Sequence, residues 1–202
     1  MTRDGDKDTF EKMLGDLGAG ETASPQMMEM LYTELRTIAN RLMQSERRPH
    51  TLQPTALVHE AFLRLVDAER VGDKGHLYFL DAAAVTMRRV LVDHARYTRA
   101  QKRGGDRGGD RVTLSGIPDA ESDKSASDAF DVDDVDIAVL DAALSELAEL
   151  DARQAKIVEL RFFGGMTGDQ IAEHCQISRS TVTRELAFSR AWLQRRIRGN
   201  GS

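Results

Sequence analysis

Near the C-terminus of the chain, four side chains that could read DNA bases fall within six residues: Arg179, Ser180, Thr183 and Arg184. An arginine can donate two hydrogen bonds to guanine or to a phosphate, and the hydroxyls of serine and threonine bond to base edges. This chemistry requires that the four side chains project from one face of a helix that enters the major groove. The flanking residues must therefore build and orient such a helix.

The flanking residues predict a helix-turn-helix. Thr167 and Gln170 have the spacing of a capping box, which starts a short helix, and Ser178 can cap a second helix after a turn that contains Ile177. The apolar residues that recur at helical spacing and would face inward are Ile171, Ala172, Cys175, Val182 and Leu186. With these residues inward, the four candidate base-reading residues face outward near the start of the second helix.

A simpler interpretation remains open, in which the same stretch is a capped helical hairpin with a solvated charged face. The turn position held by Gln176 is normally glycine, because its backbone is expected to be left-handed. A residue with a side chain costs about 1 kcal/mol in that conformation, so Gln176 strains the pattern without abolishing it.

A second basic surface is predicted on a long helix over about residues 77–102. Arginines fall within an arc of about 100° on this helix, opposite an apolar stripe. The arginines are Arg88, Arg89, Arg96, Arg99 and Arg103, and the stripe is Leu77, Leu80, Ala84, Met87, Leu91 and Ala95. A patch of one charge favours an anionic partner, whereas the alternative is a row of ordinary solvated arginines. Val85 and Val92 are apolar exceptions on the same side.

Catalytic and metal-binding chemistry is not expected. His59-Glu60 could begin a zinc-protease helix, but Leu63 stands where the second histidine would be. His174-Cys175 has no second ligand pair near it, and a cysteine at an inward position is more often part of a core. We therefore predict no catalytic residue, no metal site and no cofactor.

Composition agrees with a small helical protein. The chain has 202 residues, 41% hydrophobic and only 5% aromatic, with a formal net charge of −5. The charges are segregated, since residues 88–111 are basic and residues 119–141 are strongly acidic. A single cysteine excludes an internal disulfide, and neither a membrane-spanning run nor a signal peptide is apparent. These features predict a cytoplasmic protein without a membrane partner.

The predicted fold class is all-α, with two small helical domains joined by a flexible linker. Residues 1–24 form an N-terminal arm, and residues 25–103 form a first domain that ends in the basic helix. Residues 104–135 form an acidic linker with too few large apolar residues for a core. Residues 136–199 form the domain with the helix-turn-helix, whose second helix is expected to continue through Trp192.

Three segments of this layout resemble the extracytoplasmic-function (ECF) class of RNA polymerase sigma factors, within the sigma-70 family. Residues 55–65 resemble region 2.2 of that class, and residues 79–103 resemble regions 2.3 and 2.4. Residues 160–190 resemble region 4. The segments occur in the order and spacing of that class, two in the first predicted domain and one in the second.

The resemblance implies a promoter-specificity subunit with core RNA polymerase and promoter DNA as partners and, in some cases, an anti-sigma factor. The first domain would dock on the β′ clamp and engage the −10 element, while the second would contact the β flap and read the −35 element. The implied polymerase contacts are His59, Glu60, Leu63 and Arg64. The implied contacts to the −10 element and the backbone are Met87, Arg88, Arg89, Arg96, Arg99 and Arg103.

Two further expectations follow. Unstacked bases need aromatic side chains, and the first domain offers chiefly Tyr78, Phe79 and Tyr97, so DNA melting should be weak. The alternative function is a free-standing helix-turn-helix regulator that binds operator DNA as a dimer. A separate basic domain with a polymerase-docking helix is not needed by such a regulator and disfavours it.

Overall fold

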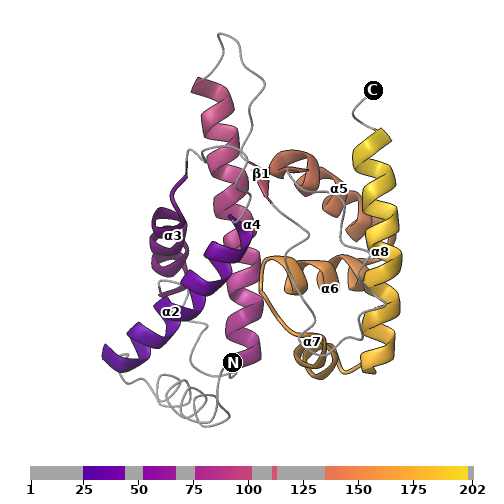
Figure 1. Cartoon of the computed structure of the whole chain (residues 1–202), viewed down its shortest axis with the longest axis horizontal. Coiled ribbons are helices and arrows are strands. Elements are labelled where there is room, and N and C mark those ends of the chain that lie inside the picture. The colour runs from indigo at the N-terminus through magenta and orange to yellow at the C-terminus, as the bar shows by residue number, and fades with distance from the viewer. Residues whose placement is uncertain (1–24, 44–51, 67–75, 102–110, 113–134, 200–202) are drawn as a thin grey trace.

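The structure is a computed structural model that describes residues 25–43, 52–66, 76–101, 111–112 and 135–199 (Figure 1). The predicted N-terminal arm, Arg103 and nearly all of the predicted linker lie outside the described residues. The described elements are α2 (Pro25–Leu42), α3 (Pro54–Val66), α4 (His76–Gln101), β1 (Arg111–Val112), β2 (Val135–Asp136), α5 (Ile137–Leu150), α6 (Ala152–Phe162), α7 (Gly168–Cys175) and α8 (Arg179–Gly199). The predicted all-α fold class is confirmed.

The first module consists of α2, α3 and α4. Proline occupies the first position of both α2 and α3, where its missing N–H would have had no partner in the helix. The apolar stripe predicted for the long helix is inside, since Leu80, Ala84, Met87, Leu91 and Ala95 are all buried. The stripe therefore faces the hydrophobic core.

The second module consists of α5 to α8. In its first helix, Ala142 and Leu150 are exposed. The side chains that face the core are Ile137, Leu140, Ala143, Leu144 and Leu147. Asp151 separates α5 from α6, because its carboxylate accepts hydrogen bonds from the N–H groups of Arg153 and Gln154, each at 3.0 Å.

A two-residue antiparallel ladder precedes the second module. Arg111 pairs with Asp136, and Val112 pairs with Val135. Val135 is buried, and the Asp136 carboxylate accepts a hydrogen bond from Ala138 N–H at 2.9 Å, which caps α5. The ladder thus places Arg111 and Val112 beside the start of α5.

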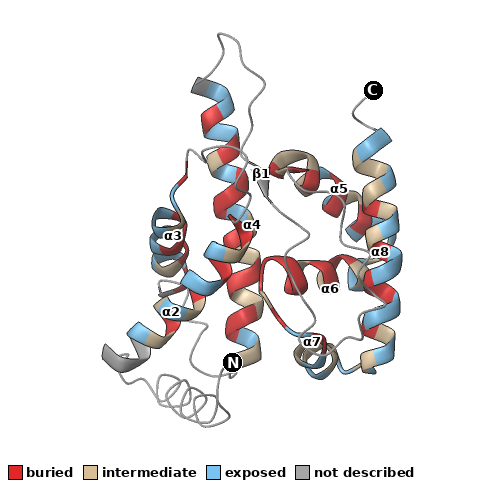
Figure 2. Ribbon diagram, viewed as in Figure 1, coloured by how far each residue is buried: buried red, intermediate tan, exposed pale blue. Residues whose placement is uncertain are grey.

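The two modules pack directly against each other through α4. This helix contacts α3 of the first module and α5, α6 and α7 of the second, and His76 at its start lies 3.4 Å from Glu34 of α2. It lies between the two groups in Figure 1. Buried residues therefore occur along α4 on more than one side (Figure 2). The apolar exception Val92, unexpected on the basic side, is buried because the second module is packed there.

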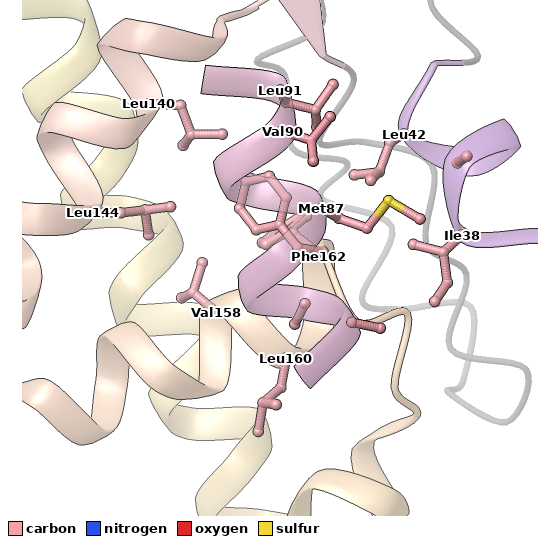
Figure 3. Packing of buried hydrophobic residues seen from close by; sticks show 14 of the residues in the cluster. Ile38, Leu42, Met87, Val90, Leu91, Leu140, Leu144, Val158, Leu160 and Phe162 are labelled. Atoms are coloured by element: carbon pink, nitrogen blue, oxygen red, sulfur yellow. The ribbon is translucent and has the colours of Figure 1, made fainter. Parts of the chain in front are cut away.

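The hydrophobic core is continuous between the modules. One cluster of buried residues includes Ile38 and Leu42 of α2, Met87 and Leu91 of α4, and Phe162 of α6. Figure 3 shows Phe162 at α4, with Leu140, Leu144 and Val158 on the side of the second module. Burial of apolar surface is the main source of folding free energy, so this shared core holds the modules together.

Candidate nucleic-acid and polymerase interfaces

The predicted helix-turn-helix is formed by α7, the turn after it and α8. Thr167 N–H donates to the Gln170 side chain at 2.8 Å, and Gln170 N–H donates to the Thr167 hydroxyl at 3.2 Å. This reciprocal pair is the capping box inferred from the sequence. Gln176 has φ 56° and ψ 44°, the left-handed conformation that was expected to favour glycine. Ser178 caps α8 by accepting a hydrogen bond from Thr181 N–H at 3.1 Å.

The outward side of the start of α8 carries three of the four predicted base-reading residues. Ser180, Thr183 and Arg184 are exposed, and 75% of the Arg184 side chain is accessible to solvent. We call these three residues the recognition face. Val182 and Leu186 are buried on the opposite side of the helix, which fixes the direction in which the recognition face points.

Arg179, the fourth predicted residue, lies back against α7. Its Nε is 3.7 Å from Asp169 Oδ1, and 37% of its side chain is exposed. The guanidinium occupies the space beside Gly168, where a Cβ atom would come within 1.1 Å of one of its nitrogens. The absence of a side chain at Gly168 therefore allows Arg179 to connect the starts of α7 and α8.

Polar contacts fix α8 on the rest of the second module. Glu185 is buried and pairs with Arg153 at 3.2 Å. Further along the helix, Arg196 donates two hydrogen bonds to Glu146, at 2.5 and 2.6 Å. These bonds lower the pKa of the Glu146 carboxyl and raise the pKa of the Arg196 guanidinium. Partial burial raises the pKa of the Cys175 thiol, as expected for a residue that packs rather than reacts.

The basic side of α4 differs from the recognition face because the second module covers part of it. Arg88 donates to Asp141 at 2.9 Å, to Glu159 at 3.2 Å, and to the carbonyl and hydroxyl oxygens of Asp141 and Ser145, each at 3.2 Å. Only 18% of its side chain is exposed. We call Arg88, Asp141, Ser145 and Glu159 the Arg88 cluster.

The other described arginines of α4 range from paired to exposed. Arg99 forms an ion pair with Asp136, while Arg96 is 69% exposed and lies 3.6 Å from Asp141. Arg89 is exposed. Arg88, Arg89 and Arg96 line a pocket of about 340 Å³ between α4 and the second module, together with Asp141 and Glu159. The predicted basic surface therefore carries acidic partners from the second module.

Two residues that the sequence suggested for −10 DNA face the core in this conformation. Met87 is fully buried, with its side chain near Ile38 and Leu42 of α2 (Figure 3). Phe79 is also buried, so it offers no stacking surface to a base. Tyr97 is 62% exposed, and Tyr78 is about half exposed and packs edge-on against His174 at 5.2 Å between ring centroids.

The predicted polymerase-binding residues lie together on the outer side of α3. Arg64 donates to Glu60 at 2.6 Å and to Asp93 of α4 at 3.2 Å, so the charged side chains are held in place. Leu63 is half exposed beside them, and His59 is exposed.

Sequence reasoning did not identify the acidic partners of the basic helix. Asp81 on α4 receives Lys156 of α6 and lies 3.0 Å from His174 Nε2 of α7. Asp141 and Glu159 hold Arg88 in the same way from α5 and α6. Asp141 was counted only as part of an acidic run, because nothing local to it indicates that α4 lies opposite.

The fold and the exposed recognition face define a helical DNA-binding protein with two modules, the second of which contains a helix-turn-helix. The family model described as ECF sigma factor matches residues 7–199, and the chain belongs to this family. It is therefore a DNA-binding regulatory subunit that acts in transcription initiation. A search of the curated proteins and a search of the solved structures each gave no match. In the described part of the chain, no helix is both long and apolar enough to cross a membrane.

Proposed function

We propose that this sigma factor binds core RNA polymerase through its first module and selects promoters by reading a −10 element with α4 and a −35 element with α8. The observation that carries the proposal is the exposed recognition face at the start of a capped, rigidly supported α8. A helix that enters the major groove suits duplex DNA, whereas a basic helix with an exposed aromatic ring suits unpaired bases.

Recognition of the −35 element is assigned to the second module. A major groove about 12 Å wide admits one helix, and residues near the start of that helix reach the base edges. Arg184 is long, charged and 75% exposed, so it is the strongest candidate for a bond to guanine or phosphate. Ser180 and Thr183 flank it and can bond to neighbouring bases or to the sugar-phosphate backbone.

Contact with the −10 element is assigned to the basic side of α4. Arg89 and Arg96 are exposed and can neutralise phosphates, while Arg88 and Arg99 become available if their acidic partners are displaced. Tyr97 is an exposed aromatic ring on the same helix and can stack on an unpaired base. We extend the proposal to Arg103, which follows α4 in the sequence. Met87 supports the helix from inside and is not assigned a DNA contact.

Polymerase binding is assigned to His59, Glu60, Leu63 and Arg64 on α3 for the clamp, with the second module meeting the flap. Truncation of a residue that becomes fully buried at the centre of an interface can lower affinity by more than about 1 kcal/mol. Leu63→Ala should therefore weaken binding to core polymerase without unfolding the protein. Asn40→Ala, at an exposed position of the neighbouring α2 to which no polymerase contact is assigned, is the control.

The decisive experiment is a pull-down with core polymerase followed by transcription in vitro on genomic fragments. The proposal expects stable association and new start sites that share spaced −10 and −35 elements. Free protein should bind promoter duplex poorly compared with its complex with polymerase. A footprint on a palindrome by the free protein, without association with polymerase, would instead establish the dimeric operator-binding regulator.

A further inference from the structure

We propose that Arg153 at the start of α6 binds a phosphate of the −35 duplex beside the base that Arg184 reads, and that the buried Glu185 positions both arginines. The sequence suggested neither Arg153 nor Glu185 for DNA binding. This inference rests on the proposed reading of the −35 element by α8, and it adds to that reading a contact from a second helix.

Glu185 is an acidic residue in the helix that is proposed to enter DNA. It directly follows Arg184 in α8, and only 8% of its side chain is exposed. Burial of a carboxylate costs free energy unless its charge is paired, and a negative charge beside DNA repels phosphates. The neighbouring inward positions of α8, Val182 and Leu186, are apolar. Stability alone does not require an acid at position 185, since apolar residues often replace a buried ion pair without loss.

The described partners of the Glu185 carboxylate are two arginines. Its Oε1 accepts a hydrogen bond from Arg153 Nη2 at 3.2 Å and lies 3.9 Å from Arg184 Nη2. Its Oε2 is buried and has no hydrogen-bond partner within the described part of the chain. Because one oxygen atom is close to both guanidiniums, Arg153 and Arg184 are neighbours although they come from different helices.

Arg153 is held at its backbone and accessible at its side chain. Its N–H donates to the Asp151 carboxylate at 3.0 Å, and the next residue, Gln154, accepts a hydrogen bond from the buried Ser189 of α8 at 3.5 Å. These bonds fix the start of α6 where this helix packs against α8 (Figure 1). In contrast, 56% of the Arg153 side chain is exposed. A guanidinium has five N–H donors, so Arg153 can hold Glu185 and still donate to phosphate oxygens.

The two arginines suit different parts of the duplex. Arg184 extends from the recognition face, whereas Arg153 lies beside that face at the start of the neighbouring helix. Contacts to phosphates fix the register and orientation of a protein on DNA, and contacts to base edges carry the sequence preference. Arg153 therefore has the position of a backbone contact and Arg184 that of a base contact. Glu185 lowers the total attraction for DNA but fixes where the two cations lie.

A simpler alternative is that Arg153 and Glu185 form an ion pair that only holds α6 on α8. An ion pair with an exposed partner contributes little to stability. Its loss would change neither the salt dependence of DNA binding nor the preference for a base. These two measurements therefore distinguish a DNA-binding role from a purely structural one.

The first test is Arg153→Ala in the full-length protein bound to core polymerase, with promoter fragments that share a constant −10 element. The variant should bind about fivefold more weakly whatever the −35 sequence, because one phosphate contact is lost. The slope of log affinity against log salt concentration should become shallower by about 1. Arg36→Ala removes an exposed arginine of α2 to which no DNA contact is assigned, and this control should match the wild type.

The second test is Glu185→Gln, which keeps the size of the side chain and removes its charge. Arg184 is then less restricted, so the ratio of affinities for the preferred −35 sequence and for one substituted at the base pair that Arg184 reads should fall about fivefold. Binding to the substituted sequence should be no weaker than in the wild type, because a negative charge near DNA is lost. Glu185→Asp keeps the charge and should retain more of the preference than Glu185→Gln.

An unchanged salt dependence for Arg153→Ala would overturn the assignment of Arg153 to DNA, and an unchanged base preference for Glu185→Gln would overturn the positioning role of Glu185. Circular dichroism verifies that each variant keeps the helical signal of the wild type. Arg153→Ala changes an exposed side chain, so it tests the proposal even if Glu185→Gln unfolds. Failure of the proposed function has a different signature, in which the wild-type complex with polymerase ignores every substitution in the −35 element.

Discussion

The two candidate DNA-binding surfaces of this sigma factor are in different states. The recognition face of α8 is exposed and supported from behind by Val182, Leu186 and the buried Glu185. The basic side of α4 is partly occupied by carboxylates from the second module. Similar arginine chemistry therefore has two outcomes, because neighbouring elements rather than the helix itself decide whether a cation is available to DNA.

The largest expected effect is on the free energy of unfolding, which should respond differently to substitutions on the two surfaces. Arg88→Ala removes the hydrogen bonds to two half-buried carboxylates and leaves beside them only Arg96, 3.6 Å from Asp141, and Lys156, 3.4 Å from Glu159, so it should lower the free energy of unfolding by about 2–3 kcal/mol. Arg184→Ala removes an exposed side chain and should change it by less than about 0.5 kcal/mol. Urea unfolding followed by circular dichroism measures the change in the free energy of unfolding for each variant. Equal changes would contradict the difference between the two surfaces.

The second expected effect concerns DNA. With core polymerase present, Arg184→Ala should weaken binding to a −35 duplex by about 1–3 kcal/mol and relax the preference at one base pair. Arg96→Ala should weaken binding about evenly across sequences and flatten its salt dependence, as loss of a phosphate contact does. Affinities measured at several salt concentrations on substituted promoters check both results. A uniform loss for Arg184→Ala would reduce it to a backbone contact.

A smaller effect is expected at Arg179, which connects the starts of α7 and α8. Because its guanidinium already lies against Gly168 and near Asp169, Arg179→Ala should lower −35 affinity by about 1 kcal/mol or less. Gly168→Ala provides the complementary change, since the new Cβ must displace the flexible end of Arg179. If Arg179→Ala lowers the affinity for −35 DNA more than Arg184→Ala does, then the Arg179 side chain moves away from α7 and contacts a base.

A substitution in the turn before α8 should give a modest increase in stability. Gln176→Gly removes the side chain from a left-handed residue and should raise the free energy of unfolding by about 0.5 kcal/mol. Gln176→Ala keeps the unfavourable Cβ and serves as the control. Thermal unfolding of the three proteins measures the difference. A loss of stability in the glycine variant would mean that the Gln176 side chain makes a contribution that outweighs its strain.

The smallest effect is a dependence on pH at the far end of α8. Hydrogen bonds from Arg196 hold the pKa of Glu146 below its ordinary value, so this carboxylate stabilises the folded state at neutral pH. The contribution is present above the unfolded pKa and is lost as the pH falls through the folded one. The stability advantage of wild type over Glu146→Gln should therefore shrink below about pH 4. Urea unfolding from pH 7 to pH 3 measures it, and a constant difference would contradict this account.

The sequence was sufficient where the determining interactions are local. Thr167, Gln170 and Ser178 act within one helical turn, so the helix-turn-helix and the left-handed Gln176 were predictable from spacing alone. The apolar stripe of α4 was equally clear, because its period matches the helix.

The sequence was insufficient where contacts join residues far apart in the chain. Arg88 and Asp141 are 53 residues apart, and no local signal indicates that one faces the other. Val92 is an apolar residue on a basic surface, and it is buried because the second module packs there. Met87 belongs both to the apolar stripe and to a segment that resembles a DNA-contacting region. In the structure it is buried near Ile38 and Leu42 of α2, as a residue of the stripe would be.

The ladder between β1 and β2 limits how far the second module can travel from the first. With its pairs formed, nine residues, 102–110, separate α4 from β1, which allows a reach of about 40 Å to the start of α5. Without the ladder, the maximum distance between the end of α4 and the start of α5 is set by the full length of residues 102–136, which is about 120 Å. If one molecule makes both proposed promoter contacts, these two short backbone pairings hold the distance between the contacts to the shorter reach for as long as they stay formed.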